Sequence, residues 1–396
     1  MNYCFIISLL HYYICIAMNI GIVCYPTFGG SGVIATELGK GLAQKGHKVH
    51  FITYKEPARL LDTFNENIFF HEVRLNDYPL FDYAPYETAL ASKLVDVAIN
   101  AKLDIFHVHY AIPHASAAFM ARQILLQKGI SVPVITTLHG TDITLVGRDA
   151  TYEPVVTYSI NQSCGVTAVS ESLRQDTFAH FDIKNEIEVI PNFIDFSRFK
   201  KTNKEHFKKA ISPNGEKILL HTSNFRKVKR VEDVINVFCK VSKEIPSKLL
   251  MIGDGPERQH AETLARSLCT TMDVRFLGKQ EAVEELLAVA DVFLLPSESE
   301  SFGLAALEAM ACEVPVVSSN AGGIPEVNIE GVTGFLLNVG DVQGMATKTL
   351  ELLKDEDKLA QFKKNAFAQA QKFDISNILP QYENFYQKIK DKGDCK

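Results

Sequence analysis

The sequence predicts an α/β protein of two domains, each built on a parallel sheet with helices on both faces. Three observations support this fold class. The chain has 396 residues, more than one hydrophobic core normally serves. Apolar strand-like runs alternate with helical patterns, which is typical of parallel α/β folds. The alternation pauses in a lysine-rich stretch, 200–209, and then restarts, which indicates a second domain of the same kind.

The first half contains six strand-like runs. They are Ile20–Tyr25, Val49–Tyr54, Asp104–Tyr110, Val132–His139, Gly165–Ser170 and Ile187–Asn192. The preceding segment, 1–17, is apolar but has no Lys or Arg, so it fits neither a signal peptide nor a membrane span of about 20 residues. We expect 1–17 to be an extension outside the functional chain, with a membrane tether as the alternative, and 18–200 to form the first domain.

The second half repeats the same alternation. Its strand-like runs are Glu216–Ser223, Ser247–Gly255, Asp273–Lys279, Asp291–Ser297 and Val314–Ser319, and the stretch from about 342 to 390 is helical in composition. We expect a second Rossmann-like domain at 201–375 and a C-terminal helix, 376–396, that crosses back to the first domain. Two such domains that face each other bind ligands in a cleft at the carboxyl ends of both sheets.

Composition excludes several classes of function. A formal net charge of −6 makes nucleic acid a poor partner. The eight cysteines form no CxxC pair and no Cys/His cluster at metal spacing, so we expect no metal site and free thiols in a reducing cytoplasm. No basic amphipathic run precedes Lys200, so a membrane surface is not expected as a partner either. The oligomeric state stays open, with a homo-oligomer as one option.

A glycine-rich loop follows the first strand, where Gly30 and Gly32 flank Ser31 ahead of a helical segment. Glycines let the backbone approach a ligand closely, and free N–H groups at a helix start favour an anion. Gly30-x-Gly32-x-x-Ala35 also fits the dinucleotide fingerprint, but the second strand ends without the acidic residue that binds the ribose. This disfavours an NAD-dependent oxidoreductase, and a merely tight turn is the remaining alternative.

Four cations in five residues, from Arg226 to Arg230, follow the first strand of the second half. Such a cluster is repulsive unless an anion meets it, and a diphosphate is the natural anion. The alternative, a solvated basic start of the next helix, is unfavourable against the helix dipole. We therefore expect a phosphate-bearing ligand at this loop.

Two acidic residues stand near the start of a later helix. Glu300 and Glu308 are eight residues apart, about 80° of rotation on an ideal helix, so they do not share one helical face. We expect Glu300 in the loop and Glu308 in the helix, where they contact two parts of one ligand. The N–H groups around Gly303 and Leu304 would then face its phosphates.

The string from Glu300 to Glu308 resembles the E-x7-E motif of the retaining GT-B glycosyltransferases of family 4. The companion strings GGSG, TTLHGTD, EVIPNFID, GDGP, FLGK and AGGIPE are also present, and the match covers essentially Met18 to the C-terminus. Within that family, HVHYAIPHA and SNFRKVKRVEDV are similar to strings of the enzymes that begin bacillithiol biosynthesis. The resemblance implies a GT-B fold, transfer of GlcNAc from UDP-GlcNAc to L-malate with retention, no cofactor or metal, and a cytoplasmic location.

The resemblance also implies roles for the donor-side residues. Arg226 and Lys229 would meet the diphosphate, Glu308 the ribose and Glu300 the sugar. The common family spacing puts the lysine five residues after the arginine, where this chain has a valine, so Lys229 and Arg230 both remain candidates for the second cation. The other expected donor-binding residues are Gly30, Ser31, Gly303 and Leu304.

In the family, the leaving phosphate takes the proton of the acceptor, and His139 is oriented toward the sugar. The expected catalytic residues are His139, Glu300 and Arg226. A small anionic acceptor needs hydrogen-bond donors near the glycine loop of the N-terminal domain, and the expected acceptor-binding residues are Ser31, Tyr110, Thr137 and Arg148. Two alternatives remain: a family 4 enzyme acting on a lipid or polysaccharide, and a catalytically silent protein that binds nucleotide sugars.

Overall fold

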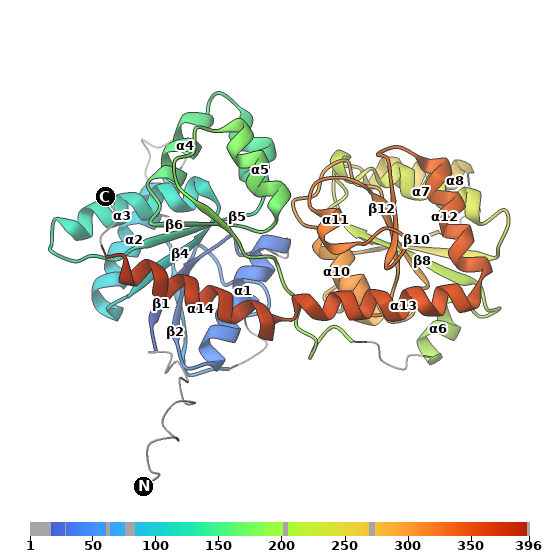
Figure 1. The fold of residues 1–396 in the computed structure, drawn as a ribbon, viewed down its shortest axis with the longest axis horizontal. Helices are drawn as coiled ribbons and strands as arrows, with labels where there is room; N and C mark the ends of the chain where they lie inside the picture. The colour runs from blue at the N-terminus through green and yellow to red at the C-terminus, as the bar shows by residue number, and fades with distance from the viewer. Residues whose placement is uncertain are drawn as a thin grey trace, which may run out of the picture.

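The computed structural model describes residues 17–27, 29–60, 64–75, 84–200, 205–268 and 274–393. Two parallel sheets lie side by side, each between layers of helices (Figure 1). The predicted α/β class with two doubly wound domains is confirmed. The expected extension, 1–17, falls outside the described residues except for Ala17, and Phe28 of the glycine loop does so too.

The first sheet has the strand order β3-β2-β1-β4-β5-β6-β7, and all of its pairings are parallel. The strands are β1 (Asn19–Val23), β2 (Lys48–Thr53), β3 (Ile68–Glu72), β4 (Ile105–His109), β5 (Val134–Leu138), β6 (Gly165–Ala168) and β7 (Ile187–Val189). The flanking helices are α1 (Gly30–Gln44), α2 (Tyr86–Ala101), α3 (Ser116–Leu126), α4 (Glu153–Asn161) and α5 (Glu171–His180), with short turns η1 (Ala111–Ala115), η2 (Thr141–Leu145) and η3 (Val146–Arg148). The chain order reverses between β1 and β4, so ligands are expected beyond the carboxyl ends of these two strands.

The second sheet has the order β10-β9-β8-β11-β12-β13. The strands are β8 (Lys217–Ser223), β9 (Ser247–Gly253), β10 (Val274–Gly278), β11 (Val292–Leu295), β12 (Val316–Ser319) and β13 (Gly334–Leu337). The helical segments are α6 (Glu205–Ile211), η4 (Lys227–Lys229), α7 (Val231–Val241), α8 (Arg258–Leu268), α9 (Val283–Leu287), α10 (Leu304–Ala311), α11 (Ile324–Val327), α12 (Val342–Lys354), α13 (Glu356–Ala370) and η5 (Gln371–Phe373). Here the order reverses between β8 and β11, which is the corresponding ligand position.

The last helix, α14 (Ile375–Asp391), returns to the first domain and lies across it (Figure 1). One face of α14 is buried against β1 and α1, through Ile378, Leu379, Tyr382, Phe385, Tyr386 and Ile389. On the same helix, the Glu383 carboxylate lies 2.5 Å from Lys45 Nζ and 3.2 Å from His47 Nε2. The helix is therefore part of the core of the first domain although it follows the second domain in the sequence.

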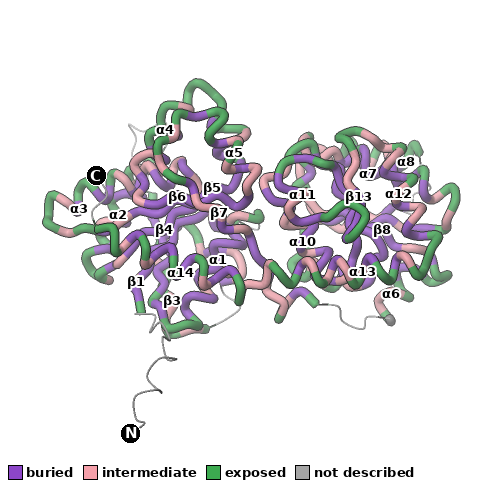
Figure 2. The backbone as a smooth tube through the Cα atoms, in the orientation of Figure 1, coloured by how far each residue is buried: buried purple, intermediate pink, exposed green. Residues whose placement is uncertain are grey.

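Burial follows the strands, with exposed residues mainly on the outer helices and loops (Figure 2). One core cluster contains residues of both domains, among them Leu173 of α5 with Phe302 and Ile324 of the second domain. Among the described residues, none of the helices combines the length and apolar character that a bilayer crossing requires.

The expectation of free thiols throughout is wrong for two of the described cysteines. Cys24 and Cys312 are free and buried, whereas Cys164 and Cys239 are disulfide-bonded. Spacing along the chain did not indicate this, because disulfide formation depends on which cysteines the fold brings within reach of one another. The cysteine pattern therefore gives no support for a reducing compartment.

Candidate active site

Two helix N-termini meet where the domains face each other. Helix α1 begins at Gly30 and α10 begins at Leu304. A Cβ atom added to Gly30 would lie 3.4 Å from Leu304 Cδ2, so the two helix starts are in near contact. Gly303, the N-cap of α10, has a φ of 93°, a conformation that favours glycine. Neither helix start has a side-chain cap, so the N–H groups of both are available to an anion such as a diphosphate.

The loops that follow β1 and β4 bring together Ser31 and Tyr110. Their hydroxyl oxygens lie 2.7 Å apart, although the residues are 79 positions apart in the chain. Gly32 makes the tight turn possible, because a Cβ there would lie 2.4 Å from the carbonyl oxygen of Tyr25. Burial raises the pKa of Tyr110 to about 12, so its hydroxyl stays protonated at neutral pH and can donate a hydrogen bond.

His139 lies next to His109 and Tyr110 and contacts the second domain through Ser301. Its Nε2 is 2.7 Å from Nδ1 of His109, and its ring centroid is 5.4 Å from that of Tyr110. Its carbonyl oxygen accepts a hydrogen bond of 2.6 Å from the Ser301 hydroxyl of the other domain. Burial lowers the pKa of His139 to about 3, so the imidazole is neutral at physiological pH. It can orient a substrate but cannot serve as a cationic acid.

The side chains of Thr137 and Arg148 contact residues other than Ser31 and Tyr110. Thr137 is fully buried in the sheet, and its hydroxyl lies 2.7 Å from His107 Nε2 and 2.7 Å from Thr167 Oγ1. Its side chain points into the domain, toward α14, and not out of the end of the strand. Arg148 is exposed, and its Nη2 lies 3.5 Å from His180 at the C-terminal end of α5. The expectation that these two side chains bind the acceptor is therefore not supported by their positions.

The donor-side cations take different positions. Lys229 Nζ lies 2.6 Å from Oε1 of Glu300, and Ser297 donates a hydrogen bond of 2.9 Å to the same oxygen. Arg230 instead pairs with Asp233 of α7 at 2.6 Å. Arg226 is exposed and forms no ion pair with any described residue. Of the two candidates for the second cation, Lys229 is therefore the one placed beside Glu300.

Two glycines of the GDGP string explain how this basic loop is held. A Cβ at Gly253 would lie 1.8 Å from the carbonyl oxygen of Ser223, and one at Gly255 would lie 2.0 Å from that of Asn224. The end of β9 therefore packs directly on the backbone that leads to Arg226. Gly253 has a φ of 120°, so both its conformation and its contact require glycine.

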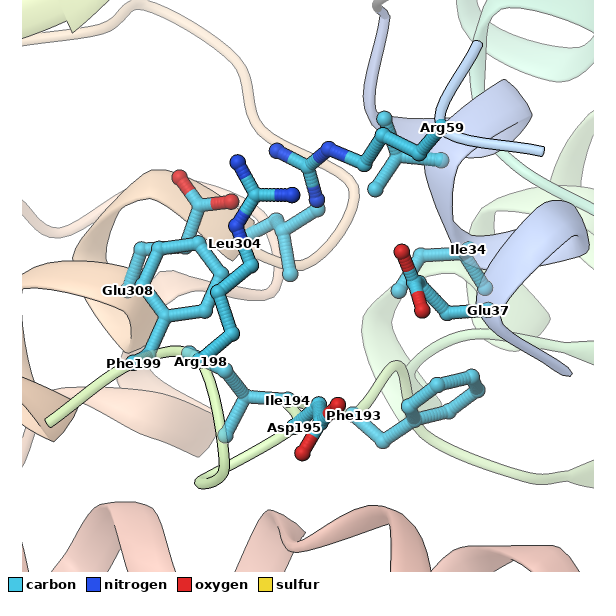
Figure 3. A pocket seen from close by; sticks show the side chains of 11 residues that line it. Ile34, Glu37, Arg59, Phe193, Ile194, Asp195, Arg198, Phe199, Leu304 and Glu308 are labelled. Carbon is cyan, nitrogen blue, oxygen red and sulfur yellow. The ribbon is translucent and has the colours of Figure 1, made fainter. Parts of the chain in front are cut away.

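Glu308 lines a pocket between the domains together with Leu304, Arg59, Arg198 and Glu37 (Figure 3). Burial raises the pKa of Glu308 from its ordinary value of 4.5 to about 7, while the positive charges of Arg59 and Arg198 act in the opposite direction. Both guanidinium groups point toward the carboxylate (Figure 3). Arg59 forms no ion pair within the described part of the chain. No motif surrounds either arginine in the sequence, so sequence reasoning missed both.

Asp142 is a further residue that sequence reasoning missed. Its carboxylate accepts hydrogen bonds from the backbone N–H groups of Ala111, at 3.0 Å, and Gly140, at 3.1 Å. It therefore joins the loops that follow β4 and β5. Burial raises its pKa to about 6. Its place within the TTLHGTD string was a usable signal. Across the described ranges, no three His, Cys, Asp or Glu side chains are grouped so that they could hold a metal ion.

Comparisons with known proteins identify the family of the chain. Residues 28–198 match the Glycosyltransferase Family 4 family, and residues 202–369 match Glycosyl transferases group 1. The chain is 47% identical over 374 residues to the N-acetyl-alpha-D-glucosaminyl L-malate synthase of Bacillus anthracis, covering 94% of this chain and 97% of that protein. It is 28% identical over 325 residues to the alpha-monoglucosyldiacylglycerol synthase of Streptococcus pneumoniae, covering 77% and 70%.

Solved structures share the fold at lower sequence identity. Anabaena HepE in complex with UDP and glucose has a TM-score of 0.79 at 22% identity, covering 93% of this chain and 99% of that chain. The sucrose-phosphate synthase of Thermosynechococcus elongatus has a TM-score of 0.77 at 20% identity, covering 95% and 100%. With two facing Rossmann-like domains and a relative 47% identical over nearly its whole length, this chain belongs to the family 4 glycosyltransferases and is an enzyme of the GT-B fold.

Proposed function

We propose that the enzyme transfers GlcNAc from UDP-GlcNAc to L-malate with retention of configuration, in the cytoplasm and without a metal ion. The observation that carries the proposal is the 47% identity, over almost both full lengths, to a protein named for that synthesis. The geometry supports it, because the acceptor-side polar groups, the hydroxyls of Ser31 and Tyr110 and the start of α1, suit a small anion.

On the donor side, Arg226 and Lys229 bind the diphosphate together with the N–H groups at Gly303 and Leu304. Glu308 accepts hydrogen bonds from the ribose hydroxyls, and Glu300 accepts them from the sugar. Lys229 and Glu300 already form an ion pair at 2.6 Å, which supports a shared task at the bond between sugar and phosphate. Fixed positive groups stabilise the charge that grows on the diphosphate as that bond breaks.

On the acceptor side, malate lies between the start of α1 and Tyr110, with its carboxylates on backbone N–H groups and hydroxyls. Thr137 supports Tyr110 through its backbone, because its carbonyl oxygen accepts a hydrogen bond of 3.0 Å from the N–H group of Tyr110. Tyr110 has a φ of 88°, which a non-glycine residue adopts rarely, so such support is needed to hold it.

The transfer itself breaks the bond from sugar C1 to the phosphate oxygen and forms a bond from C1 to the malate hydroxyl oxygen on the same face. The hydroxyl proton passes to the leaving phosphate. Glu300 is held by Lys229 and Ser297, and His139 is neutral, so both act by positioning the sugar. The chain then needs no carboxylate nucleophile.

The test is UDP release from UDP-GlcNAc with separate acceptors: L-malate, D-malate, succinate, diacylglycerol vesicles and a glucose oligomer. We expect L-malate to give the fastest release, and NMR of the product to show the α-anomer. Release with the lipid or the oligomer but not with L-malate would leave only the glycosyltransferase class. No release with any acceptor, despite UDP binding, would favour a catalytically silent protein.

Variants separate the two substrates. Ser31→Ala and Tyr110→Phe should each raise the KM for malate by about tenfold, since a hydrogen bond to a charged group contributes roughly 1.5–3 kcal/mol. The KM for UDP-GlcNAc should stay within about twofold. Thr263→Ala, on the exposed side of α8, is the control for a lost hydroxyl far from the cleft. Equal effects on both KM values would contradict the acceptor assignment.

A further inference from the structure

One carboxylate of the second domain binds the start of a helix in the first domain. Glu326, in α11, accepts hydrogen bonds from the backbone N–H groups of Glu171, at 3.0 Å, and Ser172, at 2.9 Å. These are the first two residues of α5. The N–H groups at a helix start have no partner within the helix, and a negative charge there is favourable. A side chain of the second domain thus supplies hydrogen-bond acceptors for the N–H groups at the start of a helix in the first domain.

A second pair of contacts crosses at the same place. The Ser170 hydroxyl, which caps α5 by accepting a hydrogen bond of 3.0 Å from Leu173, donates one of 2.5 Å to the carbonyl oxygen of Ser301. Ser301 in turn donates through its hydroxyl to the carbonyl oxygen of His139, at 2.6 Å. A Cβ at Gly140 would lie 2.6 Å from Ser301 Oγ, so the Ser301 side chain packs directly on the backbone of Gly140.

Glu326 is tightly attached to the loop that carries Glu300. A Cβ at Gly322 would lie 2.0 Å from the carbonyl oxygen of Glu300, and one at Gly323 would lie 2.4 Å from that of Ser301. The Gly323 N–H group also donates a hydrogen bond of 2.8 Å to the carbonyl oxygen of Glu300. The AGGIPE segment and the Glu300 loop therefore move as one unit, so a contact made by Glu326 also places the Glu300 loop.

We propose that Glu326 is a positioning residue for sugar transfer: by capping α5 across the cleft, its carboxylate aligns the Glu300 loop with His139. Closing the cleft then completes a helix cap, and the cap sets the distance between the bound sugar and the acceptor. This inference rests on the transfer reaction proposed above, but it holds for whichever acceptor releases UDP.

The test compares Glu326→Ala with Glu330→Ala. Glu330 also accepts a hydrogen bond from a backbone N–H group, that of Leu336, but within its own domain. We expect Glu326→Ala to lower kcat at least tenfold and to leave the Kd for UDP, measured by calorimetry, within about twofold. Glu330→Ala should keep kcat within about twofold. Glu326→Gln keeps an acceptor oxygen without the charge, so its kcat should lie between those of Glu326→Ala and Glu330→Ala.

Hydrogen exchange measures the cap itself, without any reaction. In peptides that cover 170–174, the amides of Glu171 and Ser172 should exchange at least tenfold faster in Glu326→Ala than in the wild type. Unchanged exchange would overturn the proposal, because the cap would then not form in solution. Faster exchange with a wild-type kcat would overturn it as well, because the contact would be structural only. If L-malate gives no UDP release but another acceptor does, the function proposed above is wrong. The Glu326 proposal is then tested by measuring kcat with that other acceptor.

Discussion

At the scale of single residues, charge and burial oppose each other at the donor site. Glu308 is an acid whose burial favours the protonated form, while Arg59 and Arg198 favour the ionised form. Its pKa of about 7 lies above the ordinary 4.5, so the folded state disfavours the ionised form. The stability that Glu308 contributes is therefore fully present below pH 4.5, declines as the pH rises toward about 7, and is lost above that pH.

This residue should make nucleotide binding pH-dependent. If the ionised carboxylate accepts hydrogen bonds from the ribose, the affinity for UDP should fall as the pH is lowered from about 8 to about 6. Calorimetry should show that fall to be roughly fivefold larger in the wild type than in Glu308→Gln, which has no proton to gain. Titration of UDP itself affects both proteins equally. Parallel pH profiles for the two would contradict the role of Glu308.

The two candidate cations are separated by substitution. Lys229→Met should lower kcat about 100-fold, because Lys229 lies beside Glu300 and, in the proposed reaction, stabilises the charge that develops on the leaving diphosphate. Arg230→Met should change kcat less than about threefold, since Arg230 pairs with Asp233 of α7 and not with Glu300. Steady-state kinetics measures both. A larger loss for Arg230→Met would assign the second phosphate contact to Arg230.

At the scale of the elements, α14 is joined to the first domain by a buried acidic residue. The Glu383 side chain is only 8% exposed and contacts Lys45 and His47, while Nδ1 of His47 accepts a hydrogen bond of 3.1 Å from the N–H group of Met18. That bond leaves Nε2 of His47 as the protonated nitrogen, which donates to Glu383. The contact therefore connects α14 both to the end of α1 and to the start of β1.

Removing this carboxylate should destabilise the protein measurably. Glu383→Ala should lower the free energy of unfolding by about 1–3 kcal/mol, because it removes the acceptor of the buried His47 ring N–H group. Glu188→Ala breaks the exposed ion pair between Glu188 of β7 and Lys388 of α14. It should lower the free energy of unfolding by less than about 1 kcal/mol. Urea denaturation gives both values. Equal losses would mean that burial adds nothing at Glu383.

At the scale of the whole molecule, chain order and spatial order differ. The last helix belongs to the first domain, so the fold is complete only after the second domain has been made. One core cluster also contains buried residues of both domains. The two domains are therefore in contact next to the cleft.

Deletion from Ile375 to the end tests this dependence. Each of the six buried side chains of α14 contributes about 1.5–3 kcal/mol, and their sum is comparable to the usual stability of about 5–15 kcal/mol. The truncated chain should therefore lose the fold of the first domain, seen as binding of a hydrophobic dye and loss of transfer activity. A melting profile like that of the full chain would show that α14 is dispensable.

The sequence by itself determined the strands with strong apolar runs and the positions of the loops that follow them. It missed two edge strands: β3, which has no buried residue, and β13, which has only four residues. Residue 69 of β3, for example, is a phenylalanine that is 37% exposed. Binding motifs were recognisable because glycines and charges cluster directly after strands, where parallel sheets bind ligands.

Only the tertiary structure decided which of those side chains meet. Ser31 with Tyr110 and Lys229 with Glu300 are pairs 79 and 71 residues apart, and they come together because their strands are neighbours at the points where the strand order reverses. Thr137 follows the same rule for position, but its side chain points into the domain. The direction of the Thr137 side chain depends on its contact with His107, which in turn contacts Tyr386 of α14. No local pattern of the sequence indicates such a contact.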